Sequence, residues 1–198
     1  MLVFLPPSEE LLPALERYRR DCLTESGMND PDALDGTAGL GNFRNLSDWL
    51  SRVRLLASPA AVLRGWFRTE VFLAVRIAEG CSLAARRSED SATLPDLVGM
   101  GNVRFPGDSP EDERAVLLCG HIGYHVRPSE RRKGYGSAIL SHAAQLCRKG
   151  GIPGPAVCVN PDNLPSLRTA LSCGFVREAR ETLPNGEEIL RLRLRMIE

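Results

Sequence analysis

A glycine-punctuated basic segment is the part of the sequence best suited to bind an anion. Residues 124–137 read Tyr-His-Val-Arg-Pro-Ser-Glu-Arg-Arg-Lys-Gly-Tyr-Gly-Ser. Gly134 and Gly136 let the backbone approach a ligand closely, and the amides that open a helix lack intrahelical partners and attract negative charge. The segment also holds four cations within seven residues, Arg127, Arg131, Arg132 and Lys133. It therefore predicts a phosphate-binding turn at the start of a helix.

The charge of the whole chain argues against a nucleic-acid partner. Its 198 residues carry 25 Lys and Arg against 25 Asp and Glu, a formal net charge of zero, and few aromatic residues lie near the cations. The positive charge is thus local, which favours one bound phosphate group. No apolar run approaches the roughly 20 residues that cross a membrane, and the first residues do not resemble a secretory signal. We expect a cytoplasmic protein without a nucleic-acid or membrane partner.

The cysteines and histidines do not predict a metal site. Six cysteines are scattered without a C-x-x-C pair, and the chain has only three histidines. Zinc sites usually show regular short spacings between such ligands. We expect free thiols in a reducing compartment and no metal.

Two common phosphate-binding motifs do not match the basic segment. A P-loop requires G-x-x-x-x-G-K-[ST], and a dinucleotide-binding turn requires G-x-G-x-x-G. Here Gly136 is followed by Ser137-Ala138-Ile139, so the third glycine is missing. Both motifs are excluded.

The hydrophobic periodicity predicts a mixed α/β fold. We expect strands at 2–5, 69–77, 97–105, 115–126, 155–160, 175–181 and 188–196, the last two joined by a hairpin turn at Asn185-Gly186. We expect helices at 8–26, 47–57, 137–149 and 164–173, with Ser47 and Asn163 as caps. Three further segments are predicted as loops, the stretch 29–41, the insertion 78–96 and the acidic turn 108–113.

The basic segment resembles the acyl-CoA signature of the GNAT superfamily of N-acetyltransferases. That signature is [RQ]-x-x-G-x-[GA], and here it reads Arg131-x-x-Gly134-x-Gly136. Downstream, Asn163-Leu-Pro-Ser166 and Gly174-Phe175 resemble the start and the end of the family's last helix. The resemblance is close over residues 98–196 and thinner before them.

The resemblance implies a GNAT-like α/β fold, with a central, mostly antiparallel sheet of about seven strands flanked by helices. Its fourth and fifth strands would splay apart and hold the cofactor between them. The chain would form one domain, 1–198, in which residues 1–97 shape the acceptor pocket and residues 98–198 bind acetyl-CoA.

The resemblance also assigns cofactor contacts. Backbone groups of Tyr124, His125 and Val126 would bind the pantetheine arm, and Asn163 and Ser166 would line the same cleft. The diphosphate would lie on the amides of residues 131–137. This stretch contains Arg131, Arg132, Lys133, Gly134, Tyr135, Gly136 and Ser137. Arg132 and Lys133 are its expected side-chain partners, and Arg127 is a candidate for the 3′-phosphate.

The resemblance implies that the acetyl group of acetyl-CoA passes to a primary amine by direct attack in a ternary complex. This reaction needs the amine in its neutral form. An alkylamine has a pKa of about 10.4, so deprotonating it at pH 7 costs about 4.6 kcal/mol. The family often places a carboxylate base in the fourth strand, about where Gly120 stands here. His121 beside it is the substitute that we predict, because its unperturbed pKa of about 6.5 suits a base.

The family's usual general acid is also missing. Relatives carry a tyrosine four residues before the Gly-Phe pair, where this sequence has Ala170. Tyr124, Ser166 or water could protonate the departing thiolate, and a thiol of pKa about 8.5 leaves without full protonation. The sequence does not choose among them.

The resemblance leaves the acceptor open, as a small-molecule or peptide amine, and allows a homodimer. Because the carboxylate and the tyrosine are missing, a second hypothesis is an acyl-CoA-binding sensor with weak catalysis. Binding of acyl-CoA without amine-dependent release of CoA would favour the sensor.

Overall fold

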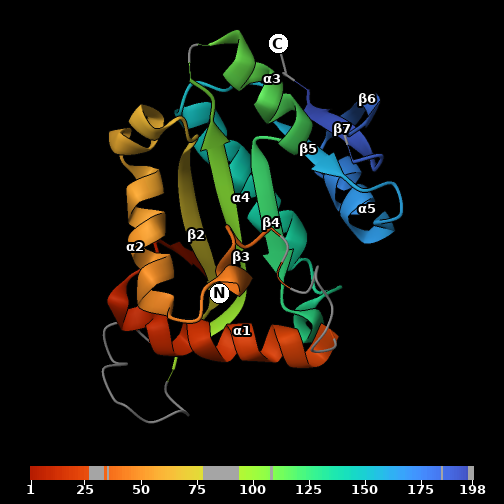
Figure 1. The fold of residues 1–198 in the computed structure, drawn as a ribbon. Helices are drawn as coiled ribbons and strands as arrows, with labels where there is room; N and C mark the ends of the chain where they lie inside the picture. The colour runs from red at the N-terminus through yellow and green to blue at the C-terminus, as the bar shows by residue number, and fades with distance from the viewer. Residues whose placement is uncertain (27–33, 35, 78–93, 108, 184, 196–198) are drawn as a thin grey trace.

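The computed structural model describes residues 1–26, 34, 36–77, 94–107, 109–183 and 185–195. Figure 1 shows its helices and strands. Residues 78–93 of the predicted insertion and residues 29–33 and 35 of the predicted loop lie outside these ranges.

Seven strands form two antiparallel sheets. The first sheet has the order β1-β2-β3-β4, with bounds Leu2–Leu5, Arg68–Arg76, Asp96–Phe105 and Ile122–Val126. The second has the order β5-β7-β6, with bounds Ala156–Val159, Glu188–Leu194 and Phe175–Thr182. Neighbouring strands within each sheet pair antiparallel, which confirms the predicted fold class. Strands β4 and β5 belong to different sheets, as expected for splayed neighbours.

Helices cover both faces of the first sheet. The helices are α1 (Leu12–Ser26), α2 (Leu46–Ala57), α3 (Pro110–Cys119), α4 (Tyr135–Lys149) and α5 (Leu164–Ser172). Figure 1 shows α1 and α2 in front of the sheet and α4 behind it. Each side has its own apolar core: Leu15, Trp49 and Met100 are buried on the α1/α2 side, and Ile139 and Val103 are buried on the α4 side.

The prediction of an acidic turn followed by a long strand at 115–126 was wrong. Residues Pro110–Cys119 form α3, and β4 begins only at Ile122. The Ser109 side chain accepts a hydrogen bond from the Asp112 amide, so this serine caps the helix. Proline at the first position and acidic residues in the first turn are typical helix-start signals. Gly120, at φ 75°, ends α3 and so precedes the strand in which the sequence analysis placed it.

The other predicted elements are confirmed with small shifts at their ends. Asn45 rather than Ser47 caps α2, because its side chain accepts from the Ser47 amide. The helix after the basic segment begins at Tyr135, two residues earlier than predicted. Asn163 caps α5 as expected.

Candidate functional site

A cleft opens between β4 and β5 and is closed at one end by His121. The backbone amide of His121 donates to the Ala156 carbonyl at 2.8 Å, and the Ala156 amide donates to His121 Nδ1 at 3.1 Å. Beyond this contact the two strands join different sheets. The resulting cleft has a volume of about 900 Å³ and is lined by β4, the turn before α4, β5, α5 and the β6–β7 hairpin.

The wide end of the cleft meets the N-terminus of α4. Gly134 is the cap residue, with φ 84° and no side chain to satisfy the helix amides. The first hydrogen bond of the helix runs from the Ala138 amide to the Gly134 carbonyl, so the amides of residues 135–137 have no helical partner. Arg132 also has a positive φ, 67°, which is rare outside glycine and marks a constrained turn. The turn thus presents amides to a ligand, as anion sites at helix N-termini do.

A buried carboxylate fixes this turn from behind. Glu130 accepts from Arg76 Nη1 at 2.9 Å and pairs with Lys133 Nζ at 3.1 Å and with Arg127 Nη2 at 3.4 Å. Burial raises the pKa of Glu130, but the hydrogen bond from Lys133 and the charge of Arg76 outweigh it and hold the pKa below its usual value. Glu130 therefore stays ionised and anchors three cations.

Three predicted contacts belong to this anchor and are not among the residues that line the cleft. Arg127 is buried and also pairs with Asp96 at 3.1 Å, which leaves it unsuited to a 3′-phosphate. Lys133 is bound to Glu130, and the Tyr135 hydroxyl accepts from Arg76 at 3.3 Å. Their side chains hold the turn, with the half-exposed Lys133 ammonium paired to Glu130.

The cleft brings together the other predicted cofactor contacts. They are Tyr124, His125, Val126, Arg131, Arg132, Gly134, Gly136, Ser137, Asn163 and Ser166. Two of them already interact, because Arg131 Nε donates to the Val126 carbonyl at 3.2 Å. The side chain of His125 points to the α1 side, where its Nδ1 shares a 2.5 Å hydrogen bond with the buried Tyr18 hydroxyl. Its contribution to the cleft is therefore its backbone.

Tyr124 places a hydroxyl group in the cleft, opposite α5. This hydroxyl shares a 2.8 Å hydrogen bond with Ser166 Oγ. Asn163 Oδ1 accepts from the Ser166 amide at 3.1 Å, so the helix cap also positions the serine. Burial raises the pKa of Tyr124 above its ordinary value, so the phenol keeps its proton at neutral pH. The protonated hydroxyl lies on the same side of β4 as the fully buried Ala170.

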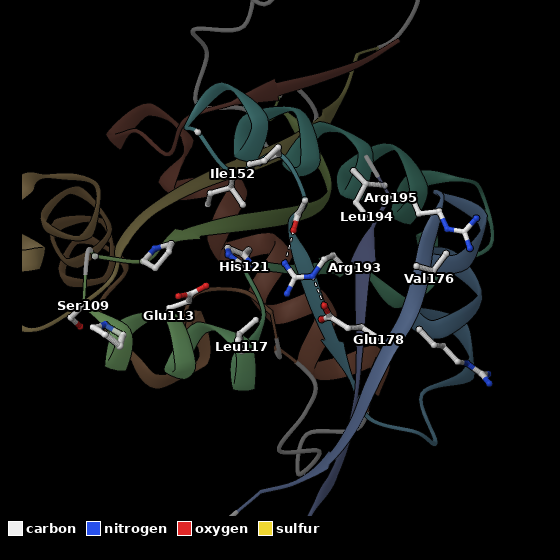
Figure 2. A pocket seen from close by; sticks show the side chains of 17 residues that line it. Ser109, Glu113, Leu117, His121, Ile152, Val176, Glu178, Arg193, Leu194 and Arg195 are labelled. Atoms are coloured by element: carbon white, nitrogen blue, oxygen red, sulfur yellow. Dashed lines mark hydrogen bonds and ion pairs between the residues drawn. The ribbon is translucent and has the colours of Figure 1, made fainter. Parts of the chain in front are cut away.

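His121 faces a different cavity from Tyr124. Figure 2 shows its ring pointing, with Glu113 and Arg193, into a space of about 840 Å³ between α3, the 151–154 segment and the second sheet. Burial, with smaller effects from Arg193 and Arg104, lowers the pKa of His121 to about 4. The ring is therefore neutral, and because Nδ1 accepts from Ala156, Nε2 carries the proton. The structure does not bring the two predicted catalytic residues together.

The cleft also contains residues that the sequence analysis missed. They are Gly36, Arg104, Cys119, Cys158, Thr169, Glu187 and Glu188, among others. Most come from elements far apart in sequence, and no motif spacing connects them. Thr169 is the exception, since it lies one turn after Ser166 on α5.

Within the described ranges, no group of three or more His, Cys, Asp and Glu side chains could hold a metal ion. No helix in the same ranges combines the length and the apolar character needed to span a bilayer.

Comparisons with known proteins agree with this geometry. The model of the acetyltransferase (GNAT) family matches residues 47–175. No curated protein matches the chain. Among solved structures, yncA from Salmonella typhimurium aligns at TM-score 0.57 and 14% identity, and the alignment covers 100% of this chain and 95% of yncA. That protein is assigned as an acetyltransferase and was solved with its cofactor acetyl-CoA.

Two further structures show the same fold. RimL, a ribosomal α-N-protein acetyltransferase in complex with coenzyme A, aligns at TM-score 0.59 and 15% identity, covering 99% and 94% of the two chains. A spermidine N-acetyltransferase SpeG chimera from Vibrio cholerae and hSSAT aligns at TM-score 0.54 and 12% identity. The alignment covers 98% of this chain and 94% of the chimera. Because the family model spans well over half of the sequence, the chain belongs to the GNAT family of acetyltransferases and is an acyltransferase.

Proposed function

We propose that the chain transfers the acetyl group of acetyl-CoA to a primary amine by direct attack in a ternary complex. The observation that carries this proposal is the uncapped N-terminus of α4, whose amides open into the cleft between β4 and β5. The acetyl-CoA of yncA and the coenzyme A of RimL support the choice of donor.

The donor fits the cleft in one direction. Its diphosphate needs the amides of residues 135–137 and the cation of Arg132, which lie at the wide end. The pantetheine arm then follows the backbone of β4 toward the narrow end, which His121 closes. Before the donor binds, the Val126 carbonyl is held by Arg131, so the arm would replace or share that hydrogen bond.

Tyr124 is the proposed general acid. The amine nitrogen attacks the thioester carbonyl, the carbon–sulfur bond breaks, and the departing sulfur takes a proton from the Tyr124 hydroxyl, which bulk water restores. The raised pKa of Tyr124 keeps that proton available, and Ser166 fixes the direction of the hydroxyl. Proton transfer of this kind typically contributes a factor of about 10² or more.

His121 is proposed as a positioning residue rather than as the base. Its Nδ1 is used by Ala156 and its Nε2 faces the cavity of Figure 2, so the neutral ring has no acceptor atom directed to the cleft. The proton that the amine must lose passes to water at the open side of the cleft.

Release of CoA with a panel of amines tests the proposal. With a thiol reagent, we expect CoA to appear at a rate that depends on both acetyl-CoA and the amine. The transferase would be rejected if the protein binds acetyl-CoA saturably but releases no CoA with anionic, neutral or cationic primary amines. That result would favour the sensor hypothesis, which is motivated by Ala170 at the position of the family's tyrosine.

A further inference from the structure

Arg104 on β3 supplies a cation to the cleft. Its Nη1 donates to the carbonyls of Cys119 at 3.2 Å and Gly120 at 3.1 Å, which fixes the side chain across the end of α3. Its side chain lines the cleft. Among the residues that the structure describes, no carboxylate lies within ion-pair distance of Arg104, whereas Arg76, Arg127, Arg191 and Arg193 all have one.

The guanidinium lies on the face of β4 opposite to the Tyr124 side chain. Successive residues of a strand point to opposite faces, so Gly123 and Tyr124 face different sides. A Cβ atom built on Gly123 would lie 3.3 Å from Arg104 Nη2, so the absent side chain leaves room for the guanidinium over the strand. An acceptor that approaches from the Gly123 side of β4 would therefore reach acetyl-CoA on the face opposite to Tyr124, the proposed general acid.

Arg104 also lies at the narrow end of the cleft. Its backbone amide donates to the His121 carbonyl at 2.7 Å, and its side chain is bonded to Gly120. The α4 amides are at the other end. A donor whose diphosphate binds those amides therefore extends its acyl group toward Arg104.

The wall beside Arg104 is preorganised. Asn102 Nδ2 donates to the Gly36 carbonyl at 2.8 Å, and a Cβ atom on Gly36 would lie only 2.5 Å from the Tyr124 carbonyl oxygen. The segment at Gly36 is thus packed directly on β4, beside Gly123 and the Asn102 and Arg104 side chains that cover it. A fixed wall and a fixed guanidinium reduce the ordering cost of binding a ligand there.

We propose that the acceptor carries an anionic group, such as a carboxylate, close to its primary amine, and that Arg104 binds that group. This inference rests on the proposed function and specifies its substrate class. A guanidinium held by two carbonyls retains N–H groups suited to a carboxylate. Glu187 and Glu188 of the β6–β7 hairpin also line the cleft, but the β5–β7 register, with Ala156 opposite Arg193 and Val159 opposite Leu190, places them toward the wide end and away from Arg104.

The test compares amino acids with their amides as acceptors. Each pair has the same primary amine and differs in the carboxylate. For the wild type we expect kcat/KM to favour the free acid by about 10- to 100-fold, the range of a charge-assisted hydrogen bond. In Arg104→Gln the preference should fall to near one, and Arg104→Lys should keep part of it. Because amide formation changes the pKa of the amine in both proteins, the ratio of the two preferences isolates Arg104.

A matched control and a binding assay separate the possible failures. Arg68→Gln removes an arginine that stacks on Phe105 and pairs with Glu70, outside the cleft, and should leave the preference unchanged. Calorimetry should show that Arg104→Gln binds CoA as the wild type does. Dipeptide amides that begin with Asp or Glu are tested beside the free amino acids, to distinguish an acidic peptide N-terminus from a free amino acid as the acceptor. A preference for either of these acceptors supports the proposal.

Two results would overturn the inference. The first is that the wild type acetylates amines without an anionic group, including polyamines, as efficiently as it acetylates the free amino acids. The other is that folded Arg104→Gln or Arg104→Lys keeps the wild-type preference or exceeds it. In both cases amine-dependent CoA release would persist, so the proposed function would survive. Loss of CoA binding by the wild type itself would instead reject the proposed function.

Discussion

His121 and Ala156 are joined by two hydrogen bonds, one through the histidine backbone at 2.8 Å and one through its ring at 3.1 Å. This pair links the two sheets at the point where β4 and β5 separate. A side chain therefore supplies the hydrogen bond that a continuing strand ladder would otherwise supply. The contact closes the narrow end of the cleft, although the ring itself lines the other cavity.

The buried His121 ring should make the protein less stable in acid. Its pKa is about 4 in the folded chain and about 6.5 when unfolded. Between these values the unfolded chain binds more protons, so the free energy of unfolding falls as the pH drops from 7 to 4, by at most about 3 kcal/mol. His121→Asn keeps an acceptor for the Ala156 amide and does not titrate. Urea unfolding at pH 7, 5.5 and 4.5 should show the wild type losing stability relative to this variant. A constant difference between the two proteins across that range would refute the assignment.

Loss of the Tyr124 hydroxyl should slow the chemical step. Tyr124→Phe removes the proposed proton donor and its 2.8 Å bond to Ser166, and we expect kcat to fall about 100-fold. The CoA affinity should change little, because the proposed cofactor contacts of this residue are through its backbone. Tyr135→Phe is the control, since its hydroxyl bonds Arg76 outside the cleft. Steady-state kinetics decide the question, and an unchanged kcat in Tyr124→Phe would remove it from the mechanism.

Gly134 should be required for cofactor binding more than for folding. With φ 84° and no atom within 4 Å of a built Cβ, a side chain there meets backbone strain but no clash within the protein. Gly134→Val should therefore lose about 1–3 kcal/mol of stability and also lose most of its CoA affinity. Gly65→Val has the same conformation, φ 69°, and the same open surroundings, so it should lose stability alone. Thermal melts and calorimetry compare the two variants. Equal CoA affinities in both would argue against a ligand at the α4 N-terminus.

Arg132 should contribute charge rather than shape. Its φ of 67° is one that asparagine tolerates, so Arg132→Asn preserves the turn and removes the cation. We expect CoA affinity to fall about 5- to 10-fold at low salt, with a smaller difference at high salt because the interaction is screened. Binding measured at two ionic strengths checks this, with Arg132→Lys as the charge-retaining control. A salt-independent loss would indicate a structural role instead.

The turn that is proposed to bind the cofactor could be predicted because its residues lie in one continuous segment. Gly134, Gly136 and the amides around them are local in sequence, so the motif specifies the turn without knowledge of the rest of the fold. Asn163 was predictable for the same reason, since a helix cap is a short-range signal. Six of the seven strands were predicted with small shifts at their ends, and only β4 was predicted to begin too early, at residue 115.

The catalytic half could not be predicted in this way. The acidic residues in the first turn of α3 are compatible with both a turn and a helix start, and the choice of a turn moved Gly120 and His121 into a strand that begins only at Ile122. Whether His121 faces the cleft depends on the alternation from that starting point and on its bond to Ala156, which is 35 residues away. Arg104 was missed because only the sheet register brings β3 beside Gly123.

A crystal structure with acetyl-CoA and an amine acceptor tests the central claim most directly. We predict density in the cleft between β4 and β5, with the diphosphate on the amides of residues 135–137 and the acetyl group toward the end closed by His121. Density for the donor in the cavity of Figure 2 instead, with the β4–β5 cleft empty, would contradict the account.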